Sequence, residues 1–202
     1  MTFTSDVKIL ALFDFDETLT TADTLPAFLA FIQPAPGFYV KVMQALPAIL
    51  SWKLGFTDNQ KAKETLMGAF MRGKTLKELE DISARFAREK MPALWRKEAV
   101  EKLKWHLESG HEVYVVTASC ETWVKAAMSM FPEVKVLGSR LAVHQGMVSG
   151  KLDGENCYGP EKVVRIKAQL PISSFSEIYA YGDSRGDREM LAMAHHPFYR
   201  RF

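Results

Sequence analysis

Residues 7–20, VKILALFDFDETLT, decide the fold of this 202-residue chain. The almost wholly apolar first half of this stretch stops abruptly at two carboxylates, Asp14 and Asp16. Short apolar runs bounded by polar residues are typical of buried strands in a parallel sheet. The ligand crevice of such a sheet lies outside the carboxyl ends of its strands. The stretch therefore predicts a central strand that delivers two acids to the edge where α/β proteins bind ligands.

Two interpretations of this acidic pair remain open on the fragment alone. Two close carboxylates are costly unless a cation neutralises them, so Asp14 and Asp16 indicate a hard, oxygen-preferring metal such as Mg²⁺. The alternative is that they cap the turn or helix that follows the strand, which is an ordinary role for aspartate.

The amino-acid composition limits which classes of protein this chain can belong to. A content of 48% hydrophobic and 25% charged residues suits one globular domain, or a domain with a modest insertion. The formal net charge of +2 and the lack of a basic stripe argue against a nucleic-acid partner. Cys120 and Cys157 are far apart and form no CxxC pair, which fits a reducing cytoplasm. No secretory signal pattern is present at the start of the sequence, so we expect a cytoplasmic location.

A segment of low charge follows the first strand. Between Thr24 and Trp52 the single charged residue is Lys41, but four prolines interrupt the segment. Its uncharged part, residues 42–52, is far shorter than the ~20 residues needed to span a bilayer. We expect two short helices with an exposed apolar edge. That edge fits either the core of a cap or a peripheral contact with a membrane or lipid-like substrate.

The next segment has helical periodicity and no strand pattern. Asp58 and the pair Thr75 and Glu78 provide N-caps for the first two helices. Because these helices all precede the second strand, they predict an all-helical insertion that covers the crevice. The expected helices span residues 59–71, 76–89 and 92–107.

The rest of the chain alternates strands with helices, which is typical of a parallel sheet with right-handed crossovers. An alternating stretch with two glycines, residues 140–152, predicts a β-hairpin. The predicted strands span residues 111–116, 134–137, 178–181 and 197–202. The predicted helices span residues 121–131, 160–168 and 188–194.

Three of the predicted strands end in polar side chains that could take part in catalysis or metal binding. These are Asp14 and Asp16, then Thr117, then Asp183 and Asp187. Four converging carboxylates would repel one another unless a bound cation and Lys162 offset their charge. A metal, a lysine and a positioned nucleophile are the groups that phosphoryl transfer requires.

Four motifs in order, DFDETLT, VVTAS, GPEK and GDSRGD, resemble those of the haloacid dehalogenase (HAD) superfamily of phosphohydrolases. The helical insertion between the first two resembles the subgroup that includes phosphoserine phosphatase and phosphatidylglycerophosphatase C. The resemblance implies an α/β fold with a HAD-like Rossmannoid parallel sheet core and an all-helical cap inserted after the first strand. It places the core at residues 1–20 and 92–202 and the cap at residues 21–91.

The resemblance also implies the role of each site residue. Asp14 would attack phosphorus and form an aspartyl-phosphate, while Asp16 would protonate the leaving alkoxide and then deprotonate water. Thr117 and the backbone after it would hold a phosphate oxygen, and Lys162 would neutralise the phosphoryl group. Asp187 would hold a metal-bound water or orient Lys162. The implied catalytic residues are Asp14, Asp16, Thr117 and Lys162; the substrate-binding residues are Asp23, Ala118, Ser119 and Arg72; the Mg²⁺ site is Asp14, Asp16, Asp183 and Asp187.

The substrate stays open at this point. Phosphoserine phosphatases usually carry glutamate at the position of Asp23 and favour GDGxND where this chain has GDSRGD, so serine phosphate is disfavoured. A small soluble phosphomonoester is the favoured substrate. The alternatives are a lipid phosphate at a membrane surface and a phosphate-binding regulatory module without turnover. Lys63, Arg72 and Arg140 are candidates for a second anionic group, and the chain fits a monomer or a homodimer.

Overall fold

The computed structural model describes residues 8–202, and its centre is a five-stranded sheet with the order β3-β2-β1-β6-β7. Each neighbouring pair of strands is parallel, which confirms the predicted α/β fold. Because β1 lies between β2 and β6, the carboxyl ends of these three strands meet at one edge of the sheet. The strands are β1 (Ile9–Phe13), β2 (Glu112–Cys120), β3 (Lys135–Ser139), β6 (Glu177–Gly182) and β7 (His196–Tyr199).

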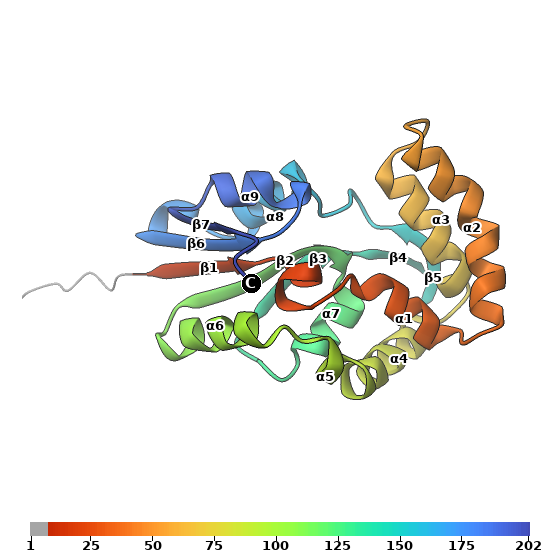
Figure 1. The fold of residues 1–202 in the computed structure, drawn as a ribbon, viewed down its shortest axis with the longest axis horizontal. Helices are drawn as coiled ribbons and strands as arrows, with labels where there is room; N and C mark the ends of the chain where they lie inside the picture. The colour runs from red at the N-terminus through yellow and green to blue at the C-terminus, as the bar shows by residue number, and fades with distance from the viewer. Residues whose placement is uncertain (1–7) are drawn as a thin grey trace, which may run out of the picture.

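Helices cover both faces of this sheet (Figure 1). Alternate side chains of β1 point to opposite faces, as the period of a strand requires. Ala11 and Phe13 join the core on the side of α6 and α7, whereas Leu10 and Leu12 join the core beneath α8 and α9. The covering helices are α6 (Lys97–Glu108), α7 (Glu121–Met128), α8 (Pro160–Gln169) and α9 (Arg188–Ala192).

Four further helices lie between β1 and β2 in the sequence and at one end of the molecule, coloured from red-orange to yellow-green in Figure 1. The hairpin of β4 and β5 is antiparallel and packs against the third of these helices. At the contact Gly150 has φ +80°, and a Cβ atom there would lie 2.5 Å from the Cα atom of Gly68. These two glycines let α3 and β5 touch. The elements are α1 (Thr24–Ile32), α2 (Gly37–Lys53), α3 (Asn59–Met71), α4 (Leu76–Glu89), β4 (Leu141–His144) and β5 (Met147–Leu152).

The boundaries between core and cap remain a prediction. The hairpin falls within the segment predicted as core, yet it packs on α3 and bonds to the α3–α4 turn, where the Gly73 N–H donates to the Val148 carbonyl. Among residues 8–202, no helix has the length and apolarity needed to cross a membrane.

Two helices differ from their predictions. The helix predicted at 92–107 is broken into α5 (Met91–Leu94) and α6, because Trp95 forms a β-bridge with Thr20 and the Arg96 N–H donates to the Leu19 carbonyl. Helix α2 is longer than expected and runs through Pro47. A proline inside a helix removes one backbone hydrogen bond; α2 nevertheless continues to Lys53 and packs along α3.

His106 of α6 is buried against the sheet. Its Nε2 atom lies 3.0 Å from the hydroxyl oxygen of Tyr181, and its Nδ1 atom lies 2.7 Å from Nδ1 of His111. Burial, followed by the proximity of His111 and Lys102, lowers the pKa of His106 from 6.5 to about 3. The ring therefore stays neutral in the folded protein at neutral and mildly acidic pH.

We expect His106 to make the protein less stable as the pH falls. The unfolded chain binds a proton below pH 6.5 and the folded chain only near pH 3, so the stability is complete above 6.5 and declines toward 3. The free energy of unfolding should fall by about 2 kcal/mol between pH 7.5 and pH 5 from this residue. Urea unfolding of wild type and His106→Gln at both pH values measures the difference.

The variant should lose about 2 kcal/mol less than wild type over this interval. His144→Gln, at an exposed histidine of β4, is the matched control and should follow wild type. Equal pH dependence of wild type and His106→Gln would contradict the prediction.

Candidate active site

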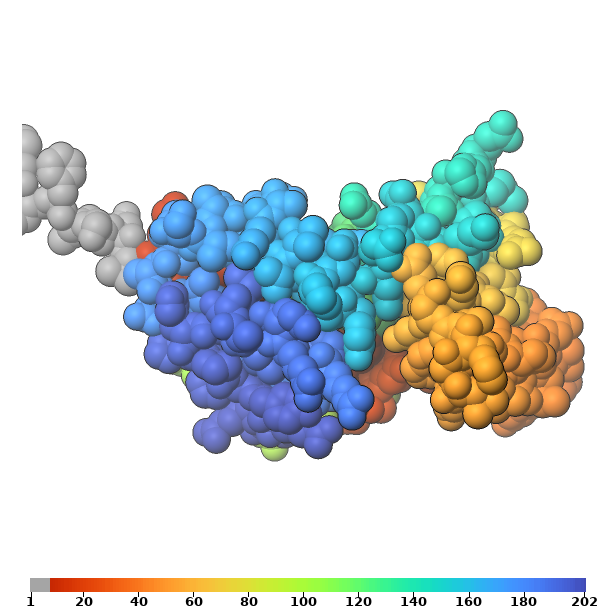
Figure 2. Space-filling view, turned by 90° about the horizontal axis from the view of Figure 1, so that it is seen from above, coloured from red at the N-terminus to blue at the C-terminus, as the bar shows by residue number. Residues whose placement is uncertain are grey.

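A cavity of about 400 Å³ lies at the carboxyl edge of the sheet, between the sheet and helices α1 to α3. Seen from above, a hollow separates the blue C-terminal helices from the orange α2–α3 pair, and the red segment after β1 is visible within it (Figure 2). Residues that were predicted separately along the chain meet here. The predicted site residues that line the cavity are Asp14, Asp16, Asp23, Thr117, Ala118, Ser119, Lys162 and Asp183.

Lys162, in the first turn of α8, connects the ends of three segments. Its Nζ atom donates to Oδ1 of Asp14 and Oδ1 of Asp187, each at 2.6 Å, and to the Val116 carbonyl at 2.7 Å. All of these groups are buried. Burial alone lowers the pKa of Lys162, but the two carboxylates outweigh it and raise the pKa above its usual range. The ammonium group is therefore charged and shared between Asp14 and Asp187.

The protein itself supplies too little positive charge to balance the negative charge of two carboxyls in the cluster. Burial raises the pKa of Asp14 to about 8; Lys162 opposes this shift, and the charges of Asp187 and Asp16 add to it. Burial and then Asp187 raise the pKa of Asp183 to about 6. One ammonium cannot balance three neighbouring carboxylates, so further positive charge is needed to keep them all ionised.

The donor set of this cluster fits a hard divalent cation. Asp14, Asp183 and Asp187 each offer a carboxylate oxygen, and the three oxygens lie within 4.8 Å of one another. Mg²⁺ binds to one or two carboxylates and completes its shell with water and substrate oxygens. The excess negative charge and the oxygen ligands therefore agree with the predicted type of cofactor.

Asp187 differs from the other two acids in its contacts. Its Oδ1 atom accepts from Lys162, and its Oδ2 atom accepts from the backbone N–H and the hydroxyl of Ser184 at 2.9 and 2.8 Å. Although burial disfavours its charge, Lys162 and Ser184 together hold the pKa of Asp187 below its usual range. It does not line the cavity, and its contact with Lys162 lies behind the carboxylates that do.

Asp16 lies in a short π-type turn, η1 (Phe15–Leu19), in which Glu17 has φ +58°. Its Oδ1 atom accepts from the backbone N–H and the hydroxyl of Thr24 at 2.7 and 2.6 Å. Its Oδ2 atom accepts from the hydroxyl of Ser119 at 2.5 Å. Asp16 is thus held between the first helix of the insertion and strand β2.

The polar end of β2 is part of the strand, although the sequence placed it just after the strand. β2 continues to Cys120, and its register against β3 shifts between Thr117 and Cys120. Within this bulge the Thr117 hydroxyl accepts from the Ser119 N–H at 3.0 Å. Bulges disrupt pairing locally and re-aim the backbone. Residues 117–119 consequently face the cavity.

The two substrate contacts predicted on the insertion have different outcomes. Asp23 lines the cavity and is the N-cap of α1, where it accepts from the Leu25 N–H at 2.9 Å. Burial and then the charge of Asp16 raise its pKa. Arg72 ends α3 outside the cavity, where its Nε atom donates to the Ser149 carbonyl at 3.1 Å, so the structure does not bring it together with the other predicted contacts.

Lys63, which the sequence also offered as a contact for an anionic group, lines the cavity. Nine helical positions separate Lys63 from Arg72, which is about 900°, so they point to opposite sides of α3. The Nζ atom of Lys63 donates to the Ala118 carbonyl at 2.5 Å and to Oδ1 of Asn156 at 2.9 Å. Lys63 therefore bonds the insertion to the sheet at the cavity wall.

Several lining residues were not singled out by sequence reasoning. Helical spacing is one signal that could have found part of the set, since three of them recur with Lys63 at intervals of three and four on α3. These three are Asn59, Ala62 and Leu66. The others include Leu25, Ile49, Trp52, Asn156 and Tyr158, whose approach depends on tertiary packing.

Fold and site together define an α/β enzyme with an acidic, lysine-bridged site at the carboxyl ends of its central strands. The chain belongs to the family of haloacid dehalogenase-like hydrolases, which it matches over residues 11–192. The predicted family is therefore confirmed, and with it the assignment of the chain to a hydrolase family.

The chain is also similar to individual proteins. Protein CicA of Caulobacter vibrioides is 33% identical over 196 residues, which cover 96% of this chain and 86% of CicA. A solved protein of unknown function from Bordetella pertussis Tohama I is 24% identical, with a TM-score of 0.80 over 93% of this chain and 87% of that one. A phospho-aspartyl intermediate analogue of phosphoserine phosphatase shares the fold at 19% identity, with a TM-score of 0.64 over 94% of this chain and 84% of that one.

Proposed function

We propose that this protein is a Mg²⁺-dependent phosphatase that hydrolyses a phosphomonoester through an aspartyl-phosphate at Asp14. The observation that carries the proposal is the bridge from Lys162 to Asp14 and Asp187 within a three-carboxylate cluster. Such a cluster provides a buried carboxylate nucleophile. The lysine can neutralise the phosphoryl oxygens, and a bound cation can neutralise the carboxylates. The fold shared with a phospho-aspartyl analogue of phosphoserine phosphatase supports it.

The proposed chemistry assigns one task to each residue. Lys162 binds Oδ1 of Asp14, so Oδ2 is the atom that attacks phosphorus. The P–O bond to the alcohol breaks as the Asp14–phosphorus bond forms, and Asp16 gives a proton to the departing oxygen. Asp16 then takes a proton from water, which attacks the aspartyl-phosphate and regenerates Asp14 with release of phosphate. Thr117 and Lys162 would hold phosphoryl oxygens during both steps.

The acidic cluster would hold the cation. Asp14 and Asp183 face the cavity and would supply carboxylate ligands, with Asp187 behind them and the Asp16 backbone carbonyl beside them. When bound, Mg²⁺ neutralises charge on the phosphoryl oxygens. Because Asp14 and Asp16 are both present, the alternative of a phosphate-binding module without turnover is less well supported.

The far wall of the cavity bears on the substrate. It is formed by apolar side chains of α1, α2 and α3, with Lys63 as a cation and Asp23 as an acid between that wall and the catalytic residues. A small phosphorylated metabolite fits the volume of about 400 Å³. The apolar wall also favours a second candidate, a lipid phosphate whose acyl portion extends along it. The apolar residues are Leu25, Ile49, Trp52, Ala62 and Leu66.

Phosphate release from a substrate panel tests the function and the substrate class together. The panel contains an aryl phosphate, amino-acid phosphates, sugar phosphates and a short-chain phosphatidic acid. We expect turnover with Mg²⁺, loss of turnover in EDTA and recovery when Mg²⁺ is restored in excess, because the cluster needs a cation to stay ionised. Absence of Mg²⁺-dependent release from every compound would contradict the proposed function.

A further inference from the structure

Helix α2 carries an apolar face that is largely exposed. We call it the α2 stripe; its members recur at intervals of three and four, which places them on one side of the helix. Met43 is 63% exposed and Leu54 is 70% exposed. The opposite side of α2, including the buried Ala45, packs on α3. The members of the stripe are Val40, Met43, Pro47, Leu50 and Leu54.

The stripe ends at a projecting tip. Leu54 and Phe56 belong to the α2–α3 turn, and Phe56 is 80% exposed. This turn extends beyond the rest of the molecule at the upper right of Figure 1, and α2 forms the right-hand end of the molecule in Figure 2. Monomeric soluble proteins rarely expose a continuous apolar surface of this kind, and such a surface marks a site of contact.

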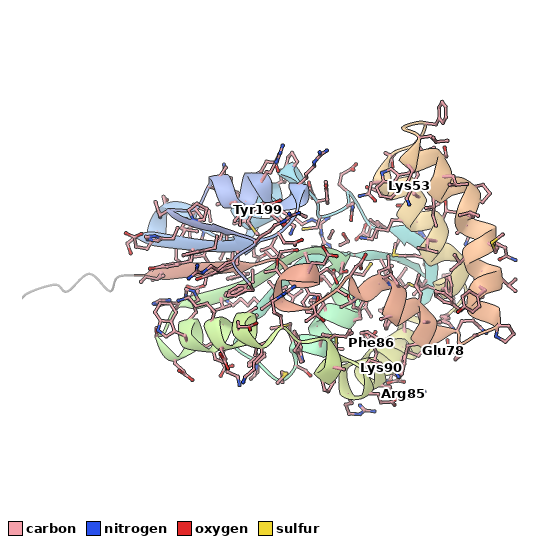
Figure 3. All side chains as sticks on the ribbon, viewed as in Figure 1. Lys53, Glu78, Arg85, Phe86, Lys90 and Tyr199 are labelled. Atoms are coloured by element: carbon pink, nitrogen blue, oxygen red, sulfur yellow. The ribbon has the colours of Figure 1, made fainter. Side chains whose placement is uncertain are left out.

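The charge around the stripe has one sign. No aspartate or glutamate occurs between Asp23 and Asp58, so every charged residue of α2 and its flanking segments is a lysine. Lys53 follows Leu50 by one turn and lies near the free end of the α2–α3 pair (Figure 3). An apolar helix face with lysine beside it and no acid is the pattern of a helix that lies in the plane of an anionic membrane interface.

The stripe is also continuous with the cavity. Ile49 and Trp52 come from the same turns of α2 as Leu50, and both line the cavity that contains Asp14. Trp52 is itself partly exposed, so it lies at the mouth of the cavity. A surface that covered the stripe would therefore lie beside the entrance to the candidate active site.

We propose that the α2 stripe docks on the surface of an anionic lipid bilayer, with Met43, Leu54 and Phe56 inserted among the lipid headgroups and Lys53 against their negative charge. A second copy of this chain fits the stripe less well, because the charged residues of α2 are lysines and pairing two such faces would bring like charges together. The projecting tip also suits insertion into a deformable surface. Docking is separate from hydrolysis, so it does not depend on the proposed function.

Co-sedimentation with vesicles tests the proposal. Wild-type protein is mixed with vesicles of phosphatidylcholine alone and with vesicles containing phosphatidylcholine and phosphatidylglycerol. We expect binding to the anionic vesicles at least fivefold above that to the neutral ones, and weaker binding as salt is added. Met43→Gln combined with Leu54→Gln should lower binding to anionic vesicles at least fivefold. Met130→Gln combined with Val164→Gln, at side chains 58% and 57% exposed on other elements, is the matched control and should bind like wild type.

Turnover of a soluble aryl phosphate and the circular dichroism spectrum establish that the variants are folded, since neither Met43 nor Leu54 lines the cavity. No binding of wild type to anionic vesicles would overturn the proposal. A lipid-free dimer in analytical ultracentrifugation that the Met43→Gln/Leu54→Gln variant abolishes would overturn it too, and would assign the stripe to a second copy. Vesicle binding without any phosphatase turnover would uphold docking and count against the proposed function alone.

Discussion

Asp14→Asn is expected to lower kcat for phosphate release by about 10³-fold or more, because an amide cannot attack phosphorus and no other described residue takes its place. Asp14 is the carboxylate that both lines the cavity and accepts from Lys162. The amide keeps the shape of the side chain, so the variant should fold. Single-turnover and steady-state assays with an aryl phosphate and Mg²⁺ measure the loss.

A matched control separates this chemical effect from a change of charge. Asp153→Asn removes a carboxylate at an exposed position of the segment after β5 and should leave kcat unchanged. Wild type quenched in acid during turnover should carry a phosphoryl adduct on the peptide that contains Asp14, and Asp14→Asn should not. Turnover of Asp14→Asn within tenfold of wild type would reject Asp14 as the nucleophile.

Lys162→Met should lower both the stability of the protein and its turnover. It removes the ammonium group shared by two buried carboxylates, and breaking a buried ion pair from one side costs about 3–5 kcal/mol. It also removes the cation that would face the phosphoryl group, so turnover should fall by about 10²-fold or more. Urea unfolding and the aryl phosphate assay measure the two effects on the same preparation.

Two further variants make the Lys162 experiment specific. Lys167→Met, at an exposed lysine on the same helix, should change neither stability nor turnover. Adding Asp187→Asn to Lys162→Met removes one of the two unpaired acids, so stability should partly recover while turnover stays low. A loss of less than about 1 kcal/mol in Lys162→Met would show that the bridge is not a buried ion pair of the usual kind.

Local signals in the sequence predicted the site well where the relevant interactions are short in range. Helices α3 and α4 have the predicted bounds. Their first residues could be predicted because Asp58 and Thr75 accept hydrogen bonds from the backbone of the first turn as N-caps. The convergence of Asp14, Thr117 and Asp183 followed from one rule, that the carboxyl ends of parallel strands meet at one edge of the sheet.

The features that were missed depend on contacts between distant segments. The break between α5 and α6 is caused by the pairing of Trp95 with Thr20, which no local pattern encodes. Which of the two candidates on α3, Lys63 or Arg72, faces the cavity depends on the rotation of α3 about its axis, and that rotation is set by packing on α2 and β5. A sequence without an alignment provides the residue types on a helix but not the direction in which each one points.

The contact of Gly68 with Gly150 joins the wall of the cavity to the β4–β5 hairpin. Hydrogen bonds continue this attachment toward the N-terminal end of α3, where Nε2 of Gln60 donates to the Gly154 carbonyl at 3.2 Å and Nζ of Lys63 donates to Oδ1 of Asn156 at 2.9 Å. Helix α3 is thus fastened along its length to the hairpin and to the segment after it. Any displacement of Lys63 from the cavity therefore requires either that these bonds break or that the hairpin moves with the helix.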